Sequence, residues 1–398
     1  MDDIASTPPA DAVDDATMDH LADTVRRFVR EELVPLERQV DEEDLVPDHI
    51  VAAMKELGLF GISIPQAYGG LGLTASQEMR LARELGWTSP AFRSVFGTNI
   101  GIGSQGILID GTPEQKEAYL PKIASGELIG SFALTEAEAG SDAASLKTTA
   151  TRDGSDYILN GTKRYITNAR RAGVFTLMAR SEPDVPGARG ISAFIVDADS
   201  PGLSVGPSEK KMGQRGAHVS EVMFDNVRVP AANIIGGEPG KGFITAMKVL
   251  DRGRLHISAI CIGAARRLIH EALGYTEDRK QFGRPLADFQ LVQAMIADSH
   301  TECYAAEGMV ADAAAKFDRG ETITLEVASC KMYASEMAGR VADRVVQIFG
   351  GSGYIADYGI ERFYRDVRLF RLYEGTTQIQ QLIIARELRK AHAQGSGR

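Results

Sequence analysis

The spacing of the apolar residues changes twice along this chain, and this change limits the folds open to it. From Met18 to about Leu128 apolar residues recur every three or four positions, as on one face of an amphipathic helix. From about Ile129 to Pro230 the period becomes two, in short runs separated by Gly and Pro, which indicates strands. Helical spacing returns from about Gly242 to Arg389. This order predicts an α+β fold and not the alternating β-α-β units of a dinucleotide fold.

We therefore predict a flexible acidic tail (1–17), an N-terminal helical domain (18–128), a central antiparallel β barrel or sandwich (129–240) and a C-terminal helical bundle (241–398). Thr112, Pro113 and Gln115 provide an N-cap, a proline at the first helical position and a capping-box partner, which predicts a helix start. In the third region Pro285 can open a helix, and further helices are expected over Glu321–Phe349 and Thr376–Lys390.

The strands of the middle region are predicted from runs of β-forming residues. Asn160-Gly161, between Tyr157–Leu159 and Tyr165-Ile166, is typical of a hairpin turn. Further strands are expected at Val174–Ala179, Ile191–Val196, Leu203–Val205 and Val219–Phe224.

Charge and composition exclude several classes of protein. The formal net charge of -10 argues against nucleic-acid binding, which depends on Lys and Arg neutralising phosphates. Three cysteines (Cys261, Cys303, Cys330) form no CxxC pair, so buried free thiols in a reducing compartment are expected. The seven histidines have no metal-ligand spacing, and no metal site is predicted. No signal peptide, transit peptide or membrane span is evident, so we expect a cytoplasmic protein without membrane insertion.

Two glycine motifs could suggest a phosphate-binding loop. Gly101, Gly103 and Gly106 spell GxGxxG, and Gly70 and Gly72 form a shorter pattern. Neither lies in a strand–turn–helix unit, so we interpret these glycines as helix-end loops or close helix contacts. A nicotinamide-binding Rossmann enzyme is excluded on this basis.

Four separated segments are hard to explain by structure alone. They are Phe132–Asp142 (FALTEAEAGSD) at a strand end, Lys163–Asn168 (KRYITN), Asp278–Pro285 (DRKQFGRP) between two helices, and Tyr373–Gln380 (YEGTTQIQ) entering the last helix. In this order, on a helix–β–helix frame, they resemble the acyl-CoA dehydrogenase family over nearly the whole chain. The resemblance implies FAD as cofactor, oxidation of an acyl-CoA to a trans-2-enoyl-CoA, a homotetramer, and an electron-transferring flavoprotein as electron acceptor.

The resemblance implies that Glu374 is the catalytic base that removes the α-proton. An ordinary glutamate, with a pKa of about 4.3, is a weak base for so poor an acid, and burial would raise its pKa. Some members of the family carry the base at the position of Gly253, and glycine cannot perform this chemistry. Taken alone, Glu374 would more often be an ordinary loop glutamate or a carboxylate at a helix N-terminus.

The same resemblance implies the remaining site residues. Thr135 and Thr167 would address the flavin ring, Tyr165 stands where many members have Trp or Phe, and Arg279 would hold a phosphate. Expected cofactor-binding residues are Phe132, Leu134, Thr135, Gly140, Ser141, Tyr165, Ile166, Thr167, Arg279, Phe282, Gln290, Gln347, Gly350, Gly351, Thr376 and Gln378. Expected substrate-binding residues are Arg93, Ser94, Ser141, Asp251, Arg254, Tyr373 and Gly375. Asp251 and Arg254 could instead form a surface ion pair.

Arg93-Ser94 resembles the pair that holds the distal carboxylate in glutaryl-CoA dehydrogenases, which suggests a dicarboxyl-CoA substrate. The glutamate that accompanies this pair there corresponds here to Gly86, and Arg93 could also serve a helix contact or face solvent. The competing functions are an acyl-CoA oxidase or a flavin-dependent monooxygenase on the same frame, and a non-catalytic relative that only binds CoA esters. Glu374 argues against a monooxygenase that needs no base, and Glu374 with both threonines argues against a non-catalytic relative. The chain length argues mildly against the larger oxidases, although the sequence does not settle oxygen access, and the dehydrogenase is the function we predict.

Overall fold

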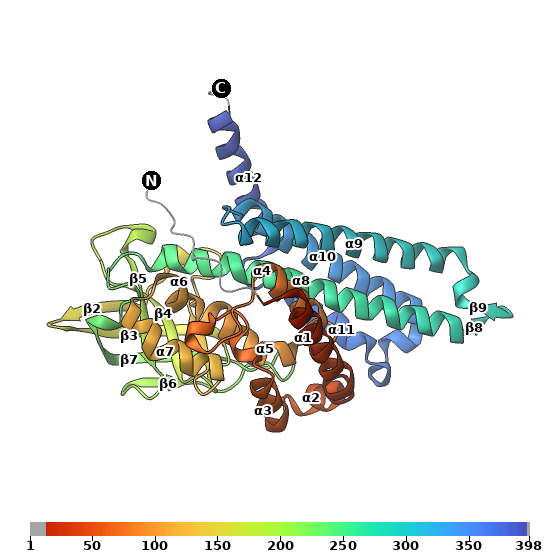
Figure 1. Cartoon of the computed structure of the whole chain (residues 1–398), viewed down its shortest axis with the longest axis horizontal. Helices are drawn as coiled ribbons and strands as arrows, with labels where there is room; N and C mark the ends of the chain where they lie inside the picture. Colours follow the sequence, from red (N-terminus) through yellow and green to blue (C-terminus); the bar gives the residue numbers. More distant parts are fainter. Residues whose placement is uncertain (1–12, 396–398) are drawn as a thin grey trace.

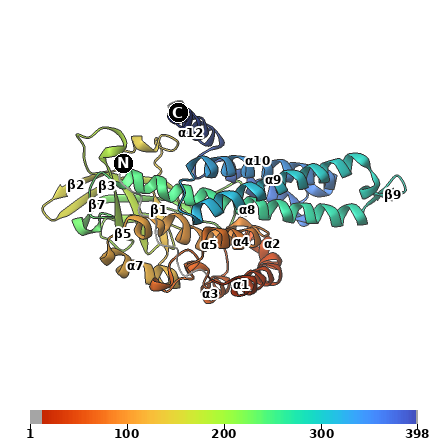
Figure 2. The same cartoon turned by 45° about the horizontal axis from the view of Figure 1, so that its top comes forward.

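The computed structural model describes residues 13–395, and its elements follow the predicted helix–β–helix order (Figure 1). The first helical group lies beside the β sheet and along the long helix α8 (Gly242–Asp278) (Figures 1 and 2). Its members are α1 (Asp15–Phe28), α2 (Glu37–Glu43), α3 (Asp48–Glu56), α4 (Ala75–Leu85), α5 (Pro90–Thr98), α6 (Gln105–Asp110) and α7 (Pro113–Ser125).

Four helices of this group (α1, α4, α5 and α7) begin at a side-chain cap. The backbone N–H of Thr112 donates to Gln115 Oε1 (3.0 Å) and that of Gln115 donates to Thr112 Oγ1 (3.3 Å), so the predicted capping box of α7 is confirmed. The α1 helix begins at Asp15, inside the segment predicted as a tail, because Asp14 accepts the N–H of Thr17 (2.9 Å). Residues 1–12 of that predicted tail lie outside the described residues.

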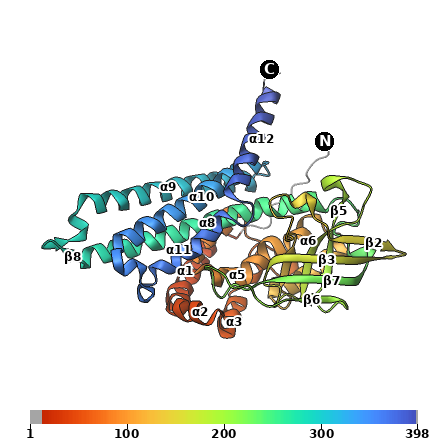
Figure 3. The same ribbon diagram turned by 180° about the vertical axis from the view of Figure 1, so that it is seen from behind.

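Seven strands form one curled sheet at one end of the molecule (Figures 1 and 3). They are β1 (Gly130–Ala133), β2 (Thr149–Asp153), β3 (Asp156–Thr167), β4 (Val174–Arg180), β5 (Ile191–Asp197), β6 (Leu203–Val205) and β7 (Val219–Pro230). Side chains alternate along β4, where Val174 and Met178 pack with the cluster that includes α7 and α8 and Phe175 and Leu177 pack against the other sheet residues.

Two details of the predicted sheet are wrong. The sheet is mixed and not antiparallel, because β4 pairs with β1 in parallel. The antiparallel pair β2–β3 lies between these two strands in the sequence. Asn160-Gly161 is not a hairpin turn but lies inside β3, at a register shift against β7. Gly161 is required there for close approach, since a Cβ would lie 2.5 Å from Thr148 Oγ1. The actual turn follows Asp153, where Gly154 has φ +65°.

The C-terminal bundle consists of α8, α9 (Gln290–Asp318), α10 (Thr324–Phe349), α11 (Ile360–Val367) and α12 (Thr377–Gly395). The short hairpin β8 (Lys280–Gln281) and β9 (Arg284–Pro285) lies at the end of the bundle farthest from the sheet, and α12 projects from the body (Figures 1 and 3). The end of α4 packs closely against α8 at Gly86, since a Cβ on Gly86 would lie 2.4 Å from Ile260 O. The α8 helix therefore runs from the sheet into the bundle at a defined distance from the N-terminal helices.

Candidate active site

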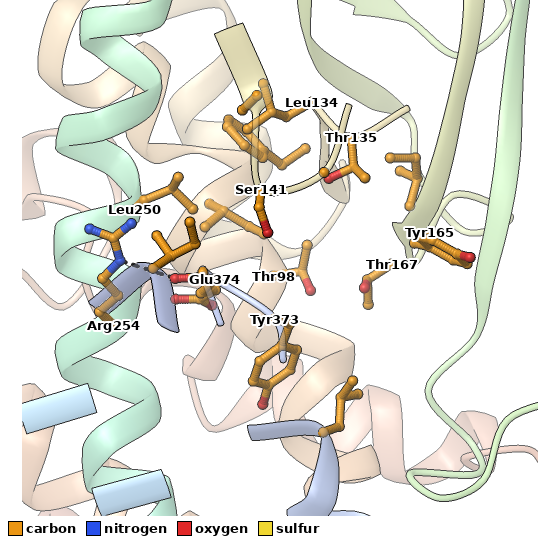
Figure 4. A pocket seen from close by; sticks show the side chains of 18 of the residues that line it. Thr98, Leu134, Thr135, Ser141, Tyr165, Thr167, Leu250, Arg254, Tyr373 and Glu374 are labelled. Atoms are coloured by element: carbon orange, nitrogen blue, oxygen red, sulfur yellow. Dashed lines mark hydrogen bonds between the residues drawn. The ribbon is translucent and has the colours of Figure 1, made fainter. Parts of the chain in front are cut away.

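A cavity of about 400 Å³ lies where the sheet, the N-terminal helices and the bundle meet. Arg93 of α5, Thr135 after β1, Thr167 at the end of β3 and Arg254 of α8 line it, together with Glu374 in the loop before α12. Figure 4 shows Glu374 and Tyr373 on one side of the cavity and Thr135, Tyr165 and Thr167 on the other. Residues from three of the four sequence segments therefore meet in one place.

Glu374 occupies an unusual backbone conformation. Its φ is +54° and that of Gly375 is +91°, so two consecutive residues are left-handed. A non-glycine residue in this region costs energy and persists only where its surroundings hold it. Arg254 contributes to that hold, since its Nε donates to Glu374 O (3.0 Å). The loop is therefore constrained in a shape that places the Glu374 side chain at the cavity.

The Glu374 carboxylate is suited to accept a proton. Its Oε2 is buried and has no hydrogen-bond partner among the described residues. Burial raises the pKa of Glu374, although the positive charges of Arg93, Lys331 and Arg254 act in the opposite direction. A carboxylate with a raised pKa and a free oxygen at a cavity is a candidate general base.

The two threonines are placed by backbone contacts between strands. The backbone N–H of Arg164 donates to Thr135 O (2.8 Å), which ties the segment after β1 to β3. Tyr165 and Asn168, on either side of Thr167, both have positive φ (59° and 62°). Asn168 Nδ2 donates to Ser94 O (2.7 Å), so the end of β3 is anchored on α5.

Tyr165 is 57% exposed, which leaves its ring available for contact at the cavity.

Arg93 is a buried cation at the cavity. Only 7% of the residue is exposed, and Nε is buried without a hydrogen-bond partner. Its side chain lies across Gly97, one turn further along α5, where a Cβ would approach Arg93 Nε to 2.3 Å. The alternative in which Arg93 faces solvent is therefore excluded. Gly86 lies at the contact with α8 and leaves no space for the glutamate expected at this position in a glutaryl-CoA enzyme.

Most of the other predicted residues of this region also line the cavity. They are Ser94, Phe132, Leu134, Gly140, Ser141, Ile166, Tyr373 and Gly375. Asp251, Thr376 and Gln378 do not line it. Asp251 accepts hydrogen bonds from Arg254 Nη1 (2.7 Å) and Thr324 Oγ1 (3.0 Å), so the ion pair considered for Asp251 and Arg254 is present, and Arg254 is buried in it.

A second group of predicted cofactor residues lies far from the cavity, at the end of the bundle that carries β8 and β9 (Figure 1). All of its members are exposed: Arg279, Phe282, Gln290, Gln347, Gly350 and Gly351. Tyr275 stacks on Phe349 (centroids 4.0 Å apart) and joins the end of α8 to the end of α10 there. Within one chain this group does not meet the cavity, and its role stays a prediction.

Several lining residues were not predicted from the sequence. Phe243, Met247 and Leu250 follow one face of α8, and Ile379, Ile383 and Arg386 follow one face of α12. The helical spacing of these six residues is the signal that could have found them. Thr98 and Gln214 also line the cavity and carry no such signal.

The three cysteines are buried and free, as predicted, and burial raises the pKa of the Cys303 and Cys330 thiols to about 12. Over residues 13–395 no cluster of His, Cys, Asp and Glu is arranged to hold a metal ion. No helix in this range is long and apolar enough to cross a membrane.

A helical N-terminal part, a curled sheet and a helical bundle meet at a cavity with a buried carboxylate, an arrangement that suits an enzyme that moves a proton. The chain matches the acyl-CoA dehydrogenase N-terminal domain over residues 15–127, the middle domain over 131–227 and the C-terminal domain over 240–389. The chain therefore belongs to the acyl-CoA dehydrogenase family, and the family implies a flavin cofactor.

Individual relatives agree with this assignment over almost the full length. An acryloyl-CoA reductase (NADH) of Anaerotignum propionicum is 43% identical over 92% of this chain and 92% of its own. An acyl-CoA dehydrogenase of Bacillus subtilis is 40% identical over 92% of this chain and 96% of its own.

Solved structures share the fold closely. The butyryl-CoA dehydrogenase of Megasphaera elsdenii superposes with a TM-score of 0.91 at 33% identity, covering 94% of this chain and 98% of that one. A chain described with the electron transferring flavoprotein of Acidaminococcus fermentans gives a TM-score of 0.91 at 35% identity, covering 95% and 99%.

Proposed function

We propose that this protein dehydrogenates an acyl-CoA thioester to the trans-2-enoyl-CoA and that Glu374 takes the α-proton. The observation that carries the proposal is the Glu374 carboxylate, whose buried Oε2 lies at the cavity and has no hydrogen-bond partner within residues 13–395. The proton leaves the α-carbon for this carboxylate while a hydride leaves the β-carbon. The carboxylate accepts only the proton, so the reaction also needs a hydride acceptor. FAD supplies that acceptor when bound.

The cavity residues fit a flavin ring. Thr135 and Thr167 offer hydroxyl groups on the wall opposite Glu374, and Tyr165 offers an aromatic face beside them. Phe132, Leu134 and Ile166 also line the cavity and supply apolar contact. An acyl chain between this wall and Glu374 would have its α-hydrogen on the side of the base.

The exposed group at the far end of the bundle supports a homotetramer. Arg279 follows α8 and Gln347 lies near the end of α10, so both belong to the end of the bundle that carries β8 and β9, away from the sheet. We therefore propose that they serve the flavin of a neighbouring copy. An arginine suits this task because its planar fork donates two hydrogen bonds to a phosphate. An electron-transferring flavoprotein is the proposed electron acceptor, and the likeness to a chain described with such a protein supports it.

Arg93 favours a narrower version of this function, in which the substrate is a dicarboxyl-CoA. A buried guanidinium without a carboxylate partner is costly, and a carboxylate at the distal end of the acyl group would offset that cost. A dicarboxyl-CoA is therefore the proposed preferred substrate. The absence of a side chain at Gly86 means that Arg93 would bind this carboxylate without the accompanying glutamate.

An anaerobic titration of the FAD-loaded protein with a panel of acyl-CoAs tests these proposals. Short, medium, branched and dicarboxylic thioesters are added while the visible flavin absorbance is followed. Bleaching with formation of enoyl-CoA is expected, strongest for a dicarboxylic thioester, and slow reoxidation by air would separate a dehydrogenase from an oxidase. A protein that takes up no FAD, or that none of the thioesters bleaches, would contradict the proposed function. Reduction of acryloyl-CoA with NADH, the reaction in the name of one relative, is measured as a separate reaction.

A further inference from the structure

Three helices contact the loop that carries Glu374, and all three use side-chain donors on two carbonyl oxygens. Arg254 of α8 donates to Glu374 O (3.0 Å). Gln380 of α12 donates from Nε2 to Glu374 O (3.2 Å) and to Gly375 O (3.1 Å). Lys331 of α10 donates from Nζ to Gly375 O (2.6 Å). These contacts hold the two left-handed residues in place.

Lys331 differs from the other two donors in its environment. The residue is completely buried, and no carboxylate of the described residues lies within ion-pair distance of its ammonium group. Burial lowers the pKa of Lys331 to about 8, and the negative charge that most opposes this shift is that of Glu374. A buried ammonium is costly, and a backbone tie alone could be made by a neutral donor, as Gln380 does.

The charges around Glu374 come from several elements. Arg93 of α5, Lys331 of α10 and Arg254 of α8 all favour its ionised form, whereas burial opposes it. Arg254 is paired with Asp251 (2.7 Å), so part of its charge is already compensated. Around Lys331 itself, Glu336 favours the charged form and Arg254 disfavours it. The Cys261 thiol also faces Lys331, but burial raises its pKa and keeps it uncharged. Lys331 is therefore a largely uncompensated cation that faces the base from the side of the bundle.

We propose that Lys331 is a positioning residue for the base: its ammonium group holds the Glu374 loop through Gly375 O and stabilises the ionised Glu374 carboxylate. This inference rests on the proposed function, in which Glu374 accepts the α-proton. It adds a residue from α10 that does not line the cavity and would contact neither substrate nor flavin.

The test compares Lys331→Met with Gln380→Leu, a matched variant that removes a neutral donor from the same carbonyl oxygens. The rate of flavin reduction by an acyl-CoA is measured from pH 5.5 to 9.5, and FAD content and thermal unfolding report folding. Lys331→Met should move the acid limb of the profile upward by about one pH unit, which is a roughly tenfold loss on that limb. Lys331→Arg should keep the original limb. Gln380→Leu should leave the limb in place, whatever its effect on the maximum rate.

An unshifted acid limb in Lys331→Met, or an equal shift in Gln380→Leu, would overturn the inference and leave Lys331 a structural residue. If Lys331→Met does not fold, Lys331→Gln replaces it, because the amide keeps a donor and removes the charge, and the same shift is required. Glu374→Gln distinguishes failure of the proposed function from failure of this inference. Retained flavin reduction in Glu374→Gln would show that Glu374 is not the base. Loss of reduction in Glu374→Gln, with no shift in the Lys331 variants, would remove only this inference.

Discussion

Gly253 of α8 lies directly against the carboxylate of Glu374, and a Cβ at Gly253 would be 2.5 Å from Glu374 Oε2. The two positions that can carry the base in this family are therefore neighbours in space, although they are 121 positions apart in the sequence. The missing side chain at Gly253 provides the space in which the Glu374 carboxylate lies.

Gly253→Ala should displace the carboxylate and slow flavin reduction roughly tenfold to a hundredfold, because a misplacement near 1 Å can cost that much. The fold should tolerate the change, since the contact is with the end of a flexible side chain and Ala favours a helix interior. Gly274→Ala is the matched control on the same helix, where no atom lies within 4 Å of the added Cβ. Stopped-flow reduction should separate the two variants, and equal rates would show that this space has no role.

The rate of flavin reduction should fall as the pH is lowered through the pKa of Glu374. The base must be ionised to accept a proton, and burial raises its pKa above the ordinary value of 4.5, against the opposing charges of Arg93, Lys331 and Arg254. The acid limb of the profile should therefore lie above pH 4.5. A rate that stays constant down to that pH would be inconsistent with a buried base.

Arg93→Met should harm dicarboxyl-CoA substrates selectively. The change removes a guanidinium that is 7% exposed and keeps much of its apolar volume, but it also removes a positive charge that favours the ionised Glu374. Neutral acyl-CoAs should therefore be used as well as before at a pH above the acid limb, where Glu374 is ionised in both proteins. The measurement is kcat/KM for a dicarboxylic thioester and for a neutral thioester of equal length, with an expected relative loss of at least tenfold. An equal effect on both substrates would dispose of the carboxylate hypothesis.

Asp366 should make the stability of the protein fall as the pH rises. Burial raises the pKa of Asp366 to about 7, although the backbone N–H of Gln214 and the charges of Arg362 and Arg365 oppose the shift. A carboxyl whose folded pKa exceeds its unfolded pKa contributes stability that is lost as the pH rises through about 7. Melting temperatures from pH 5 to 8.5 should fall less steeply for Asp366→Asn than for the wild type. Parallel curves would mean that Asp366 does not titrate in this range.

The sequence allowed the order of helices and strands to be predicted because apolar spacing follows local geometry. Val174–Ala179 and Leu203–Val205 agree with β4 and β6 to within one residue, since their runs are short and bounded by turn residues. The hairpin predicted at Asn160-Gly161 was wrong because a bulge and a hairpin turn both favour glycine. The close approach of Thr148 to Gly161, which explains the glycine inside β3, is visible only in the fold. The parallel pairing of β1 with β4 depends on contacts between distant segments, which local patterns do not contain.

The site residues likewise fall into those that a sequence motif predicts and those that only the fold brings to the site. Glu374, Thr135 and Thr167 were predicted because they stand in recognisable motifs, and all three line the cavity. Lys331 was missed because a lysine in a helical stretch is normally a solvated residue, and its burial arises only from the packing of α10 in the bundle. The position of Arg279 relative to the cavity likewise became apparent only from the fold.

The most direct test of the central claim is anaerobic reduction of FAD-loaded Glu374→Gln by an acyl-CoA that bleaches the wild-type protein. Gln has nearly the volume of Glu but cannot accept the α-proton, so the variant should bind FAD and acyl-CoA and reduce its flavin at least a thousandfold more slowly, within the range of general-base effects. A reduction rate close to that of the wild type would contradict the assignment of Glu374 as the base.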